Sequence, residues 1–309
     1  MLPLQRLNTA RNDREEHASV ERPVLVLGAA GQLGQTVAAS FEREWHTVGL
    51  TRRDLDVTDA AAVYQRVSQL RPWAIVNCAA YNDVDRAEEE PVAAMAANAL
   101  AVLTLARAAR EASAVLVHYG SDFVFDGETN RPYREDDAVA PQSVYAGSKL
   151  LGEWFAEQAP VHYVLRVESL FGGAGPHKSS LDRIVEAIAN RAAVRVFVDR
   201  VVSPSFAPDV AAATASLLRR RPEPGLYHCV NSGATTWHEL ASYVRNKLDS
   251  DAVLEPVTMT DVQLAAKRPR YCALSNDKLR GAGINMPAWQ DALDRYLTVR
   301  PATSAELKG

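Results

Sequence analysis

Between Pro23 and Gly172 the chain alternates short runs of apolar residues with longer stretches in which apolar positions recur at helical spacing. The short runs predict buried strands at residues 24–27, 46–50, 73–79, 114–121 and 161–167. Helices are predicted between them, and the one after the second strand opens with the candidate N-caps Thr58 and Asp59. This alternation predicts an α/β fold in which helices cover both faces of a doubly wound parallel sheet.

Beyond Gly172 the apolar runs are less regularly spaced. A strand is predicted at 194–198 and a helix at 208–220, and Thr236 with Glu239 forms a candidate capping box for a further helix. The segment "MPAWQDALDRYL" predicts the last helix. This part of the chain is therefore predicted to form a smaller C-terminal α/β lobe beside the sheet.

The composition is that of an ordinary globular protein, with 47% apolar and 23% charged residues in a chain of 309. The formal net charge of −4 and the pI of about 6.0 make nucleic acid and anionic membrane surfaces unexpected partners. Cys78, Cys229 and Cys272 are far apart and form no CxxC pair. Neither a disulfide framework nor a thiolate metal site is therefore expected.

The N-terminal segment 1–22 lacks the apolar region of a secretory signal, and its arginines are offset by acidic residues. We predict that it is a flexible arm, and that residues 300–309 form a polar tail. No apolar stretch is expected to approach the roughly 18 residues that a membrane-spanning helix needs. These features predict a cytoplasmic protein with no membrane partner.

A glycine-rich turn follows the first predicted strand, in the sequence "LGAAGQLGQ". Gly28, Gly31 and Gly34 allow a tight turn and a close approach of the backbone to a ligand, so the N–H groups of the following helix can bind a pyrophosphate. A glycine triplet alone is weak evidence, but its position between a strand and a helix strengthens it. The turn predicts a nucleotide-binding site.

The end of the second strand bears on which nicotinamide cofactor binds there. An acidic residue at this place favours the ribose diol of NAD, whereas arginine accommodates the 2′-phosphate of NADP. The sequence "LTRRDL" has Arg52 and Arg53 at this place. We therefore predict NADPH, with NADH as the alternative.

Tyr145 and Lys149 lie four residues apart at the start of a predicted helix, on one face of it. A phenol has a pKa of about 10 and exchanges protons poorly at neutral pH unless its anion is stabilised. A lysine ammonium one turn away supplies that stabilisation. Ser121, at the end of a neighbouring strand, can polarise a carbonyl group. His118, inside the same apolar strand, is instead predicted to be a buried core residue.

These motifs together resemble the extended short-chain dehydrogenase/reductases and, within them, the dTDP-4-dehydrorhamnose reductase family. The resemblance runs from about Val24 to Leu297 and is most specific in "GSDFVFDG" and "PYREDDAVAPQSVYAGSKLLGE". Further matching segments are "GAAGQLGQ", "NCAAYNDVDRAEEEP", "SPSFAPDVA" and "RPRYCAL".

The resemblance implies hydride transfer from NAD(P)H to C4 of a dTDP-4-keto-6-deoxy-sugar, as in rhamnose biosynthesis. Tyr145 would protonate the alkoxide, Lys149 would tune Tyr145 and bind the nicotinamide ribose, and Ser121 would bind the ketone oxygen. The remaining cofactor-binding residues that it implies are Gly28, Gly31, Gln32, Leu33, Arg52, Arg53, Asp56, Val57, Ala79, Ala80, Tyr81 and Asn98. The further residues implied to bind substrate are Asn82, Val84, Phe123, Arg200 and Arg268.

The chain departs from the family pattern at several positions near the sugar. Asn82 stands where threonine is usual, Leu170 where tryptophan is frequent, and Arg200 where glutamine is usual, and an arginine there can hold a phosphate instead. Thr36 stands where some relatives have a glutamate for a magnesium-linked dimer. We therefore predict no metal, and either a monomer or a homodimer.

The predicted organisation is an NAD(P)-binding Rossmann domain at 23–172 and a mainly substrate-binding lobe at 173–299, with some later segments returning to the Rossmann domain. Two alternative functions remain. A nucleotide-sugar epimerase or dehydratase would share the fold, and Asp122 lies where dehydratases have an acid, but no glutamate follows it. A non-catalytic NADP-binding subunit, resembling the regulatory subunit of methionine adenosyltransferase, would keep the tyrosine and lysine.

Overall fold

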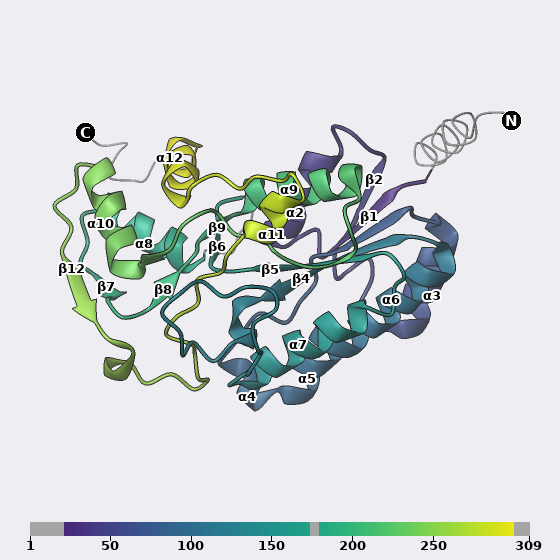
Figure 1. Cartoon of the computed structure of the whole chain (residues 1–309), viewed down its shortest axis with the longest axis horizontal. Helices are drawn as coiled ribbons and strands as arrows, with labels where there is room; N and C mark the ends of the chain where they lie inside the picture. The colour runs from purple at the N-terminus through teal and green to yellow at the C-terminus, as the bar shows by residue number, and fades with distance from the viewer. Residues whose placement is uncertain (1–21, 174–178, 300–309) are drawn as a thin grey trace, which may run out of the picture.

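The computed structural model describes residues 22–173 and 179–299, so the predicted N-terminal arm and C-terminal tail lie outside the described residues, apart from Arg22. Its centre is a six-stranded parallel sheet (Figure 1). The strands follow the order β10-β5-β4-β3-β1-β2. Their bounds are β1 (Val24–Leu27), β2 (Thr47–Leu50), β3 (Ala74–Asn77), β4 (Val115–Ser121), β5 (His162–Val167) and β10 (Gly225–His228). The predicted doubly wound α/β fold is confirmed.

Helices cover both faces of this sheet because its strands are apolar on both sides. One face packs against α2 (Gln32–Phe41), α9 (Ala207–Arg220) and α11 (Asp277–Gly281). The other packs against α3 (Ala60–Leu70), α6 (Ala101–Ala112) and α7 (Val144–Ala156). Asp59 is the N-cap of α3, as predicted, and its side chain accepts a 3.0 Å hydrogen bond from the N–H of Ala62. Strand β10 pairs with β5, so the chain returns to the main sheet between segments that belong to the smaller lobe.

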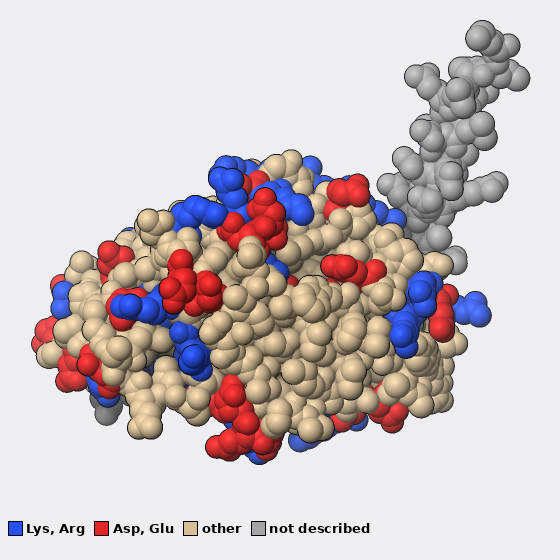
Figure 2. Space-filling model, turned by 60° about the horizontal axis from the view of Figure 1, so that its bottom comes forward, with Lys and Arg blue, Asp and Glu red and all other residues tan. Residues whose placement is uncertain are grey.

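A continuous helix from Pro91 to Ala112 corrects one expectation, because it is long and apolar enough to cross a membrane by length and composition alone. It comprises α5 (Pro91–Met95), a π-helical turn η1 (Ala96–Leu100) and α6, and it follows the short α4 (Arg86–Glu89). Half of its most apolar stretch is buried in the protein, as in a core helix. Val92 and Leu100 are exposed on this helix. The side of the molecule on which α5 and α6 lie shows few charged side chains over its centre (Figure 2).

The smaller lobe lies at the carboxyl ends of the main strands and has its own core, which includes Leu181, Val202 and Trp237 (Figure 1). It contains α8 (Ser180–Ala189), α10 (Trp237–Lys247) and α12 (Trp289–Val299). Two short 3₁₀ turns lie in connections elsewhere in the chain, η2 (Asp122–Val124) directly after β4 and η3 (Met259–Asp261) before α11. Its strands pair as β6 (Leu170–Phe171) with β9 (Ser205–Phe206), β7 (Val194–Phe197) with β12 (Leu254–Val257), and β8 (Val201–Val202) with β11 (Thr235–Thr236). The predicted capping box between Thr236 and Glu239 is present at the start of α10.

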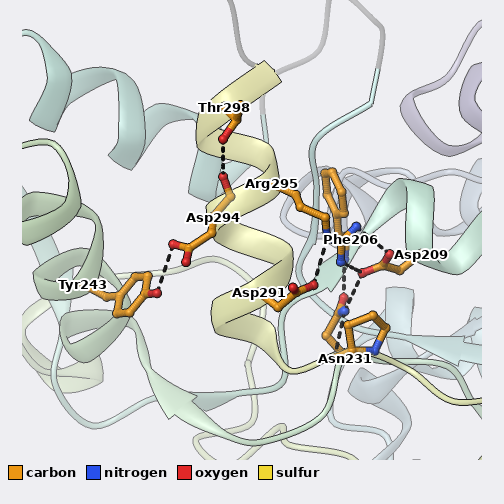
Figure 3. Close-up of polar contacts among 9 residues, drawn as sticks. Phe206, Asp209, Asn231, Tyr243, Asp291, Asp294, Arg295 and Thr298 are labelled. Atoms are coloured by element: carbon orange, nitrogen blue, oxygen red, sulfur yellow. Dashed lines mark hydrogen bonds and ion pairs between the residues drawn. The ribbon is translucent and has the colours of Figure 1, made fainter.

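A polar network joins α12 of the lobe to α9 of the main domain (Figure 3). Arg295 binds both carboxylate oxygens of Asp209, at 2.9 and 2.7 Å, and also binds Asp291 within its own helix. Asn231 donates to Asp209 at 2.7 Å and accepts from the N–H of Phe206 at 2.8 Å. The network holds the lobe against the sheet, and so fixes the cleft between them.

Candidate active site

A cleft of about 520 Å³ lies where the carboxyl ends of the sheet strands face the smaller lobe. Open α/β sheets bind ligands at this edge, where the strand order reverses. The predicted site residues that line the cleft are Gly31, Gln32, Leu33, Ala79, Ala80, Asn82, Val84, Ser121, Phe123, Tyr145, Lys149, Arg200 and Arg268. Residues predicted from distant parts of the sequence therefore meet in one cavity.

The glycine turn forms the part of the cleft next to β1. Gly28 has a φ of +71°, and a Cβ there would lie 2.7 Å from the backbone nitrogen of Ala79. A Cβ on Gly34 would collide with the carbonyl oxygen of Gly28. Gly31 is the N-cap of α2, with no side chain capping the helix. The glycines thus let the turn pack closely against the backbone after β3, and the first N–H groups of α2 have no side-chain cap, which suits a pyrophosphate.

Tyr145 lies in the first turn of α7, beside Ser121 at the end of β4. Ser143 is the N-cap of this helix and accepts a 3.2 Å hydrogen bond from the N–H of Ala146. The phenol ring packs edge-on against Phe123 with their centroids 5.5 Å apart. Burial raises the pKa of Tyr145, and the neighbouring Asp122 carboxyl raises it further, while a hydrogen bond with Ser121 lowers it. The phenol is therefore a neutral proton donor at physiological pH.

Lys149 lies one helical turn after Tyr145 and is almost fully buried. Its Nζ donates a 2.5 Å hydrogen bond to the main-chain carbonyl of Tyr119 in β4. Burial lowers the pKa of Lys149 to about 8, against the opposing effect of the Glu153 carboxylate. Glu153 is itself paired with Arg166, at 2.7 Å, in the interior of the protein. A positive charge is thus held at the cleft within one turn of the phenol.

Asn98 does not line the cleft but connects the segment after β3 to helix α7 beside it. Its side chain accepts from the N–H of Tyr81 at 2.8 Å and donates to the carbonyl of Tyr81 and to Ser148, both at 3.0 Å. The hydroxyl of Ser148 donates to the carbonyl of Tyr145 at 2.7 Å. Asn98 lies in the π-helical turn η1, and such turns are frequent at functional sites. It couples the segment after β3 to the turn that carries Tyr145.

The residues predicted to hold the adenosine half of the cofactor lie outside this cavity, after β2. Arg52 and Arg53 are exposed, and Arg52 lies 3.7 Å from a carboxylate oxygen of Asp56. Asp56 accepts hydrogen bonds from the N–H and the hydroxyl of Thr58, at 3.0 and 2.7 Å, which lower the pKa of its carboxyl. Val57 lies beside it, half-buried. The two arginines are thus accessible to a phosphate group.

Arg268 reaches the cleft from the C-terminal part of the chain, but it is already paired. Its guanidinium binds both oxygens of Asp85, at 2.9 and 2.7 Å, and lowers the pKa of that carboxyl to about 2. Asn82 and Val84, on the same loop as Asp85, line the cleft close by. The pair therefore closes one side of the predicted sugar site.

His118 is buried, as predicted, with its Nδ1 3.2 Å from the side-chain amide of Asn77. Burial lowers its pKa well below the usual value, so the ring is neutral. A neutral imidazole inside β4 is a packing residue rather than a catalyst.

The sequence interpretation missed a buried polar cluster beneath Ser121, formed by Asp122, Glu168, Arg200 and Cys272. One ligand-type atom from each of Asp122, Glu168 and Cys272 lies within 4.8 Å of the others. The Nη2 atom of Arg200 lies 3.7 Å from the Cys272 sulfur, so a guanidinium already supplies positive charge here. The signal that could have identified Glu168 is a carboxylate directly after the predicted strand that ends in "YVLRV". The absence of a metal remains a prediction.

Comparison with known proteins agrees with this geometry. The family profile described as "RmlD substrate binding domain" matches residues 22–300. A dTDP-4-dehydrorhamnose reductase of Streptomyces griseus is 37% identical over 278 residues, which cover 87% of this chain and 91% of the relative. A probable dTDP-4,6-dihydroxy-2-methyloxan-3-one 4-ketoreductase of Streptomyces antibioticus is 36% identical over 274 residues, covering 87% and 92%. The crystal structure of dTDP-4-dehydrorhamnose reductase from Bacillus anthracis in complex with NADP is 29% identical, with a TM-score of 0.86 over 91% of this chain and all of that one.

Proposed function

The chain belongs to the dTDP-4-dehydrorhamnose reductase family, and we propose that it is an NADPH-dependent oxidoreductase that reduces the C4 ketone of a dTDP-4-keto-6-deoxy-sugar. The observation that carries the proposal is the meeting of Ser121, Tyr145 and Lys149 in one cleft beside the glycine turn. The reaction would belong to the biosynthesis of rhamnose or of a related deoxysugar.

The cofactor fits the residues that are present. The tight turn at Gly28 and the uncapped N-terminus of α2 suit the pyrophosphate, while Ala79 and Ala80 form a small-residue wall of the cleft. Arg52 and Arg53 would hold the 2′-phosphate. NADPH, when bound, supplies the hydride for the carbonyl carbon. NADH remains the alternative cofactor, and the two arginines decide between them.

Side chains of the protein supply the proton that the ketone oxygen takes up. Tyr145 donates its phenolic hydrogen to the ketone oxygen as that oxygen becomes an alkoxide. Ser121 donates a second hydrogen bond to the same oxygen, which polarises the carbonyl before reduction. Lys149 stabilises the phenolate that remains and can also hold a ribose hydroxyl. Each role uses a side chain that already lies in the cleft.

The proposed substrate side of the cleft is formed by Asn82, Val84 and Phe123 of the main domain together with Arg200 and Arg268. We assign the sugar to this region, and we assign residues 173–299 mainly to substrate binding with 23–172 as the cofactor domain. The relative from Streptomyces antibioticus is named for a different 4-keto substrate. The proposal therefore specifies the 4-keto group and the nucleotide-sugar class. A cytoplasmic location and a monomeric or homodimeric state remain predictions.

The proposal is tested by incubating the purified chain with NADPH and a dTDP-4-keto-6-deoxyhexose. We expect loss of NADPH absorbance together with a product that carries an alcohol at C4, seen by mass spectrometry and NMR. Epimerised or dehydrated sugar with no net oxidation of NADPH would favour the alternative enzymes. Tight NADPH binding without turnover would favour the non-catalytic subunit.

A further inference from the structure

The hydroxyl of Ser121 has its single hydrogen committed in this structure. It accepts a 3.2 Å hydrogen bond from the N–H of Phe123 and donates at 3.1 Å to Oδ1 of Asp122. It also lies beside the phenol of Tyr145. A hydroxyl that donates to Asp122 cannot donate the same hydrogen to a ketone in the cleft. The direction of this hydrogen bond therefore matters for the proposed reduction.

Asp122 lies in surroundings that favour its neutral form. The residue is 3% exposed, and its Oδ2 is buried with no hydrogen-bond partner among residues 22–173 and 179–299. Glu168, 2% exposed, places a carboxylate oxygen within 4.8 Å of a carboxylate oxygen of Asp122. One guanidinium, that of Arg200, acts on both carboxylates. Two buried carboxylates beside a single cation retain a proton, because both cannot ionise cheaply.

Apart from Arg200, the titratable groups that face this pair from other elements are neutral, so the proton is held by one of the two carboxylates. Cys272, on the C-terminal loop, and Tyr145, on α7, face Asp122, while Tyr271 acts on Glu168. Burial raises the pKa of each of these three groups, so all are neutral through the physiological range. Burial also raises the pKa of Asp122 and of Glu168, and the charge of Asp122 raises that of Glu168 further.

We infer that Asp122 is a positioning residue for the proposed reaction, and that the proton it shares with Glu168 sets the direction in which Ser121 donates. This inference rests on the proposed function. When Asp122 carries the proton, it donates to Ser121, and the hydroxyl of Ser121 is free to donate to the ketone. When Asp122 is ionised, it draws the hydrogen of Ser121 toward itself and away from the substrate.

The protons balance along the same chain of groups. The new alkoxide forms an O–H bond with the hydrogen of Tyr145, whose own O–H bond breaks. The phenolate then recovers a hydrogen from Ser121, and Ser121 recovers one from the carboxylic acid of Asp122. The pair is left ionised and takes up a proton from water after the product leaves the cleft.

The experiment compares the pH profiles of kcat/KM for the wild-type chain, Asp122→Asn, Glu168→Gln and a control, Glu135→Gln. Glu135 is another carboxyl whose pKa burial raises, but it binds the N–H of His228 outside the cleft. Without Glu168, Asp122 is left beside Arg200 with no second carboxylate, and it ionises ~1–3 pH units lower. The kcat/KM of Glu168→Gln divided by that of the wild-type chain should therefore be near one in acid, and it should fall at least ~10-fold by neutral to alkaline pH. The Asp122→Asn ratio should instead rise with pH, because an amide does not ionise.

Constant ratios for both variants, as expected for Glu135→Gln, would show that the pair is merely structural and overturn the inference. A wild-type chain that does not reduce the keto sugar would contradict the proposed function instead. A carboxyl ¹³C NMR titration of the wild-type chain tests the shared proton even where a variant does not fold. A proton that stays on the pair of Asp122 and Glu168 at neutral pH would support the inference. Ionisation of both at the usual ~4 would overturn it.

Discussion

Lys149 and Tyr119 join helix α7 to strand β4 by a 2.5 Å hydrogen bond from Nζ to a main-chain carbonyl, one turn beyond Tyr145. The bond holds a buried ammonium at a fixed place at the cleft, although burial lowers the pKa of Lys149 to about 8. Burying this charge lowers the free energy of unfolding. Its fixed position allows the ammonium to stabilise the phenolate of Tyr145.

Replacing Lys149 with methionine should change how stability depends on pH. The folded-state pKa lies below the unfolded value of about 10.4, so the unfolded chain binds more protons between these two values. The free energy of unfolding of the wild-type chain should therefore rise relative to Lys149→Met as pH increases from about 8 to about 10. Urea unfolding at a series of pH values measures this difference.

The matched control is Lys278→Met. Lys278 also donates to a main-chain carbonyl, that of Leu226 at 2.7 Å, but it lies on the surface. Its variant should parallel the wild-type chain at every pH. If the Lys149 variant does so as well, the ammonium is not buried as described.

The exposed arginines after β2 should decide the choice of cofactor. Replacing Arg52 and Arg53 together with alanine removes the charge available to a 2′-phosphate and leaves the glycine turn intact. A charge-assisted contact is typically worth ~1.5–3 kcal/mol, so NADPH affinity should fall about tenfold or more. Titration with NADH provides the internal control, because NADH has no 2′-phosphate. Equal weakening of both cofactors would contradict the assignment.

Asn98 should act on cofactor binding and on stability together. Asn98→Ala removes the contacts to Tyr81 and Ser148 and leaves buried polar groups without partners, which costs ~1–3 kcal/mol. We expect a lower unfolding free energy and weaker NADPH binding. Thr104→Ala is the control, because Thr104 lies on the adjoining helix with its hydroxyl on the carbonyl of Leu100 at the surface. A variant that lost stability but bound NADPH as tightly as the wild-type chain would show that Asn98 does not position the segment after β3 for the cofactor.

The buried pair of Glu153 and Arg166 should be sensitive to the loss of either partner. Glu153→Gln leaves the Arg166 charge uncompensated, which typically costs ~3–5 kcal/mol. The double variant Glu153→Gln with Arg166→Met removes both charges and should recover much of that loss. Thermal unfolding of the four chains gives the coupling free energy. Additive losses would mean that the two side chains do not depend on each other.

The parts of the site that could be predicted from the sequence are those that depend on local spacing. Strand–turn–helix geometry determines the glycine turn, and the helical repeat brings Tyr145 and Lys149 to one face. Ser121 could be located because a polar residue at the end of a buried strand must lie at the sheet edge. These residues do meet in the cleft.

The parts that could not be predicted depend on contacts between distant segments. Arg200 lines the cleft as predicted, but the sequence did not show that its charge also acts on Asp122 and Glu168, which come from the ends of different strands. Arg268 was expected at the sugar, and its pairing with Asp85 joins residues 183 positions apart. No local pattern encodes such a contact, because the lobe must first pack against the sheet.

The most direct test of the account is the activity of Tyr145→Phe with NADPH and a dTDP-4-keto-6-deoxyhexose. The variant keeps the ring that packs against Phe123 and loses the hydroxyl that protonates the alkoxide. We predict that kcat falls by ~10²–10⁴-fold while NADPH affinity stays near that of the wild-type chain. A Tyr145→Phe chain that reduces the sugar at close to the wild-type rate would contradict the account.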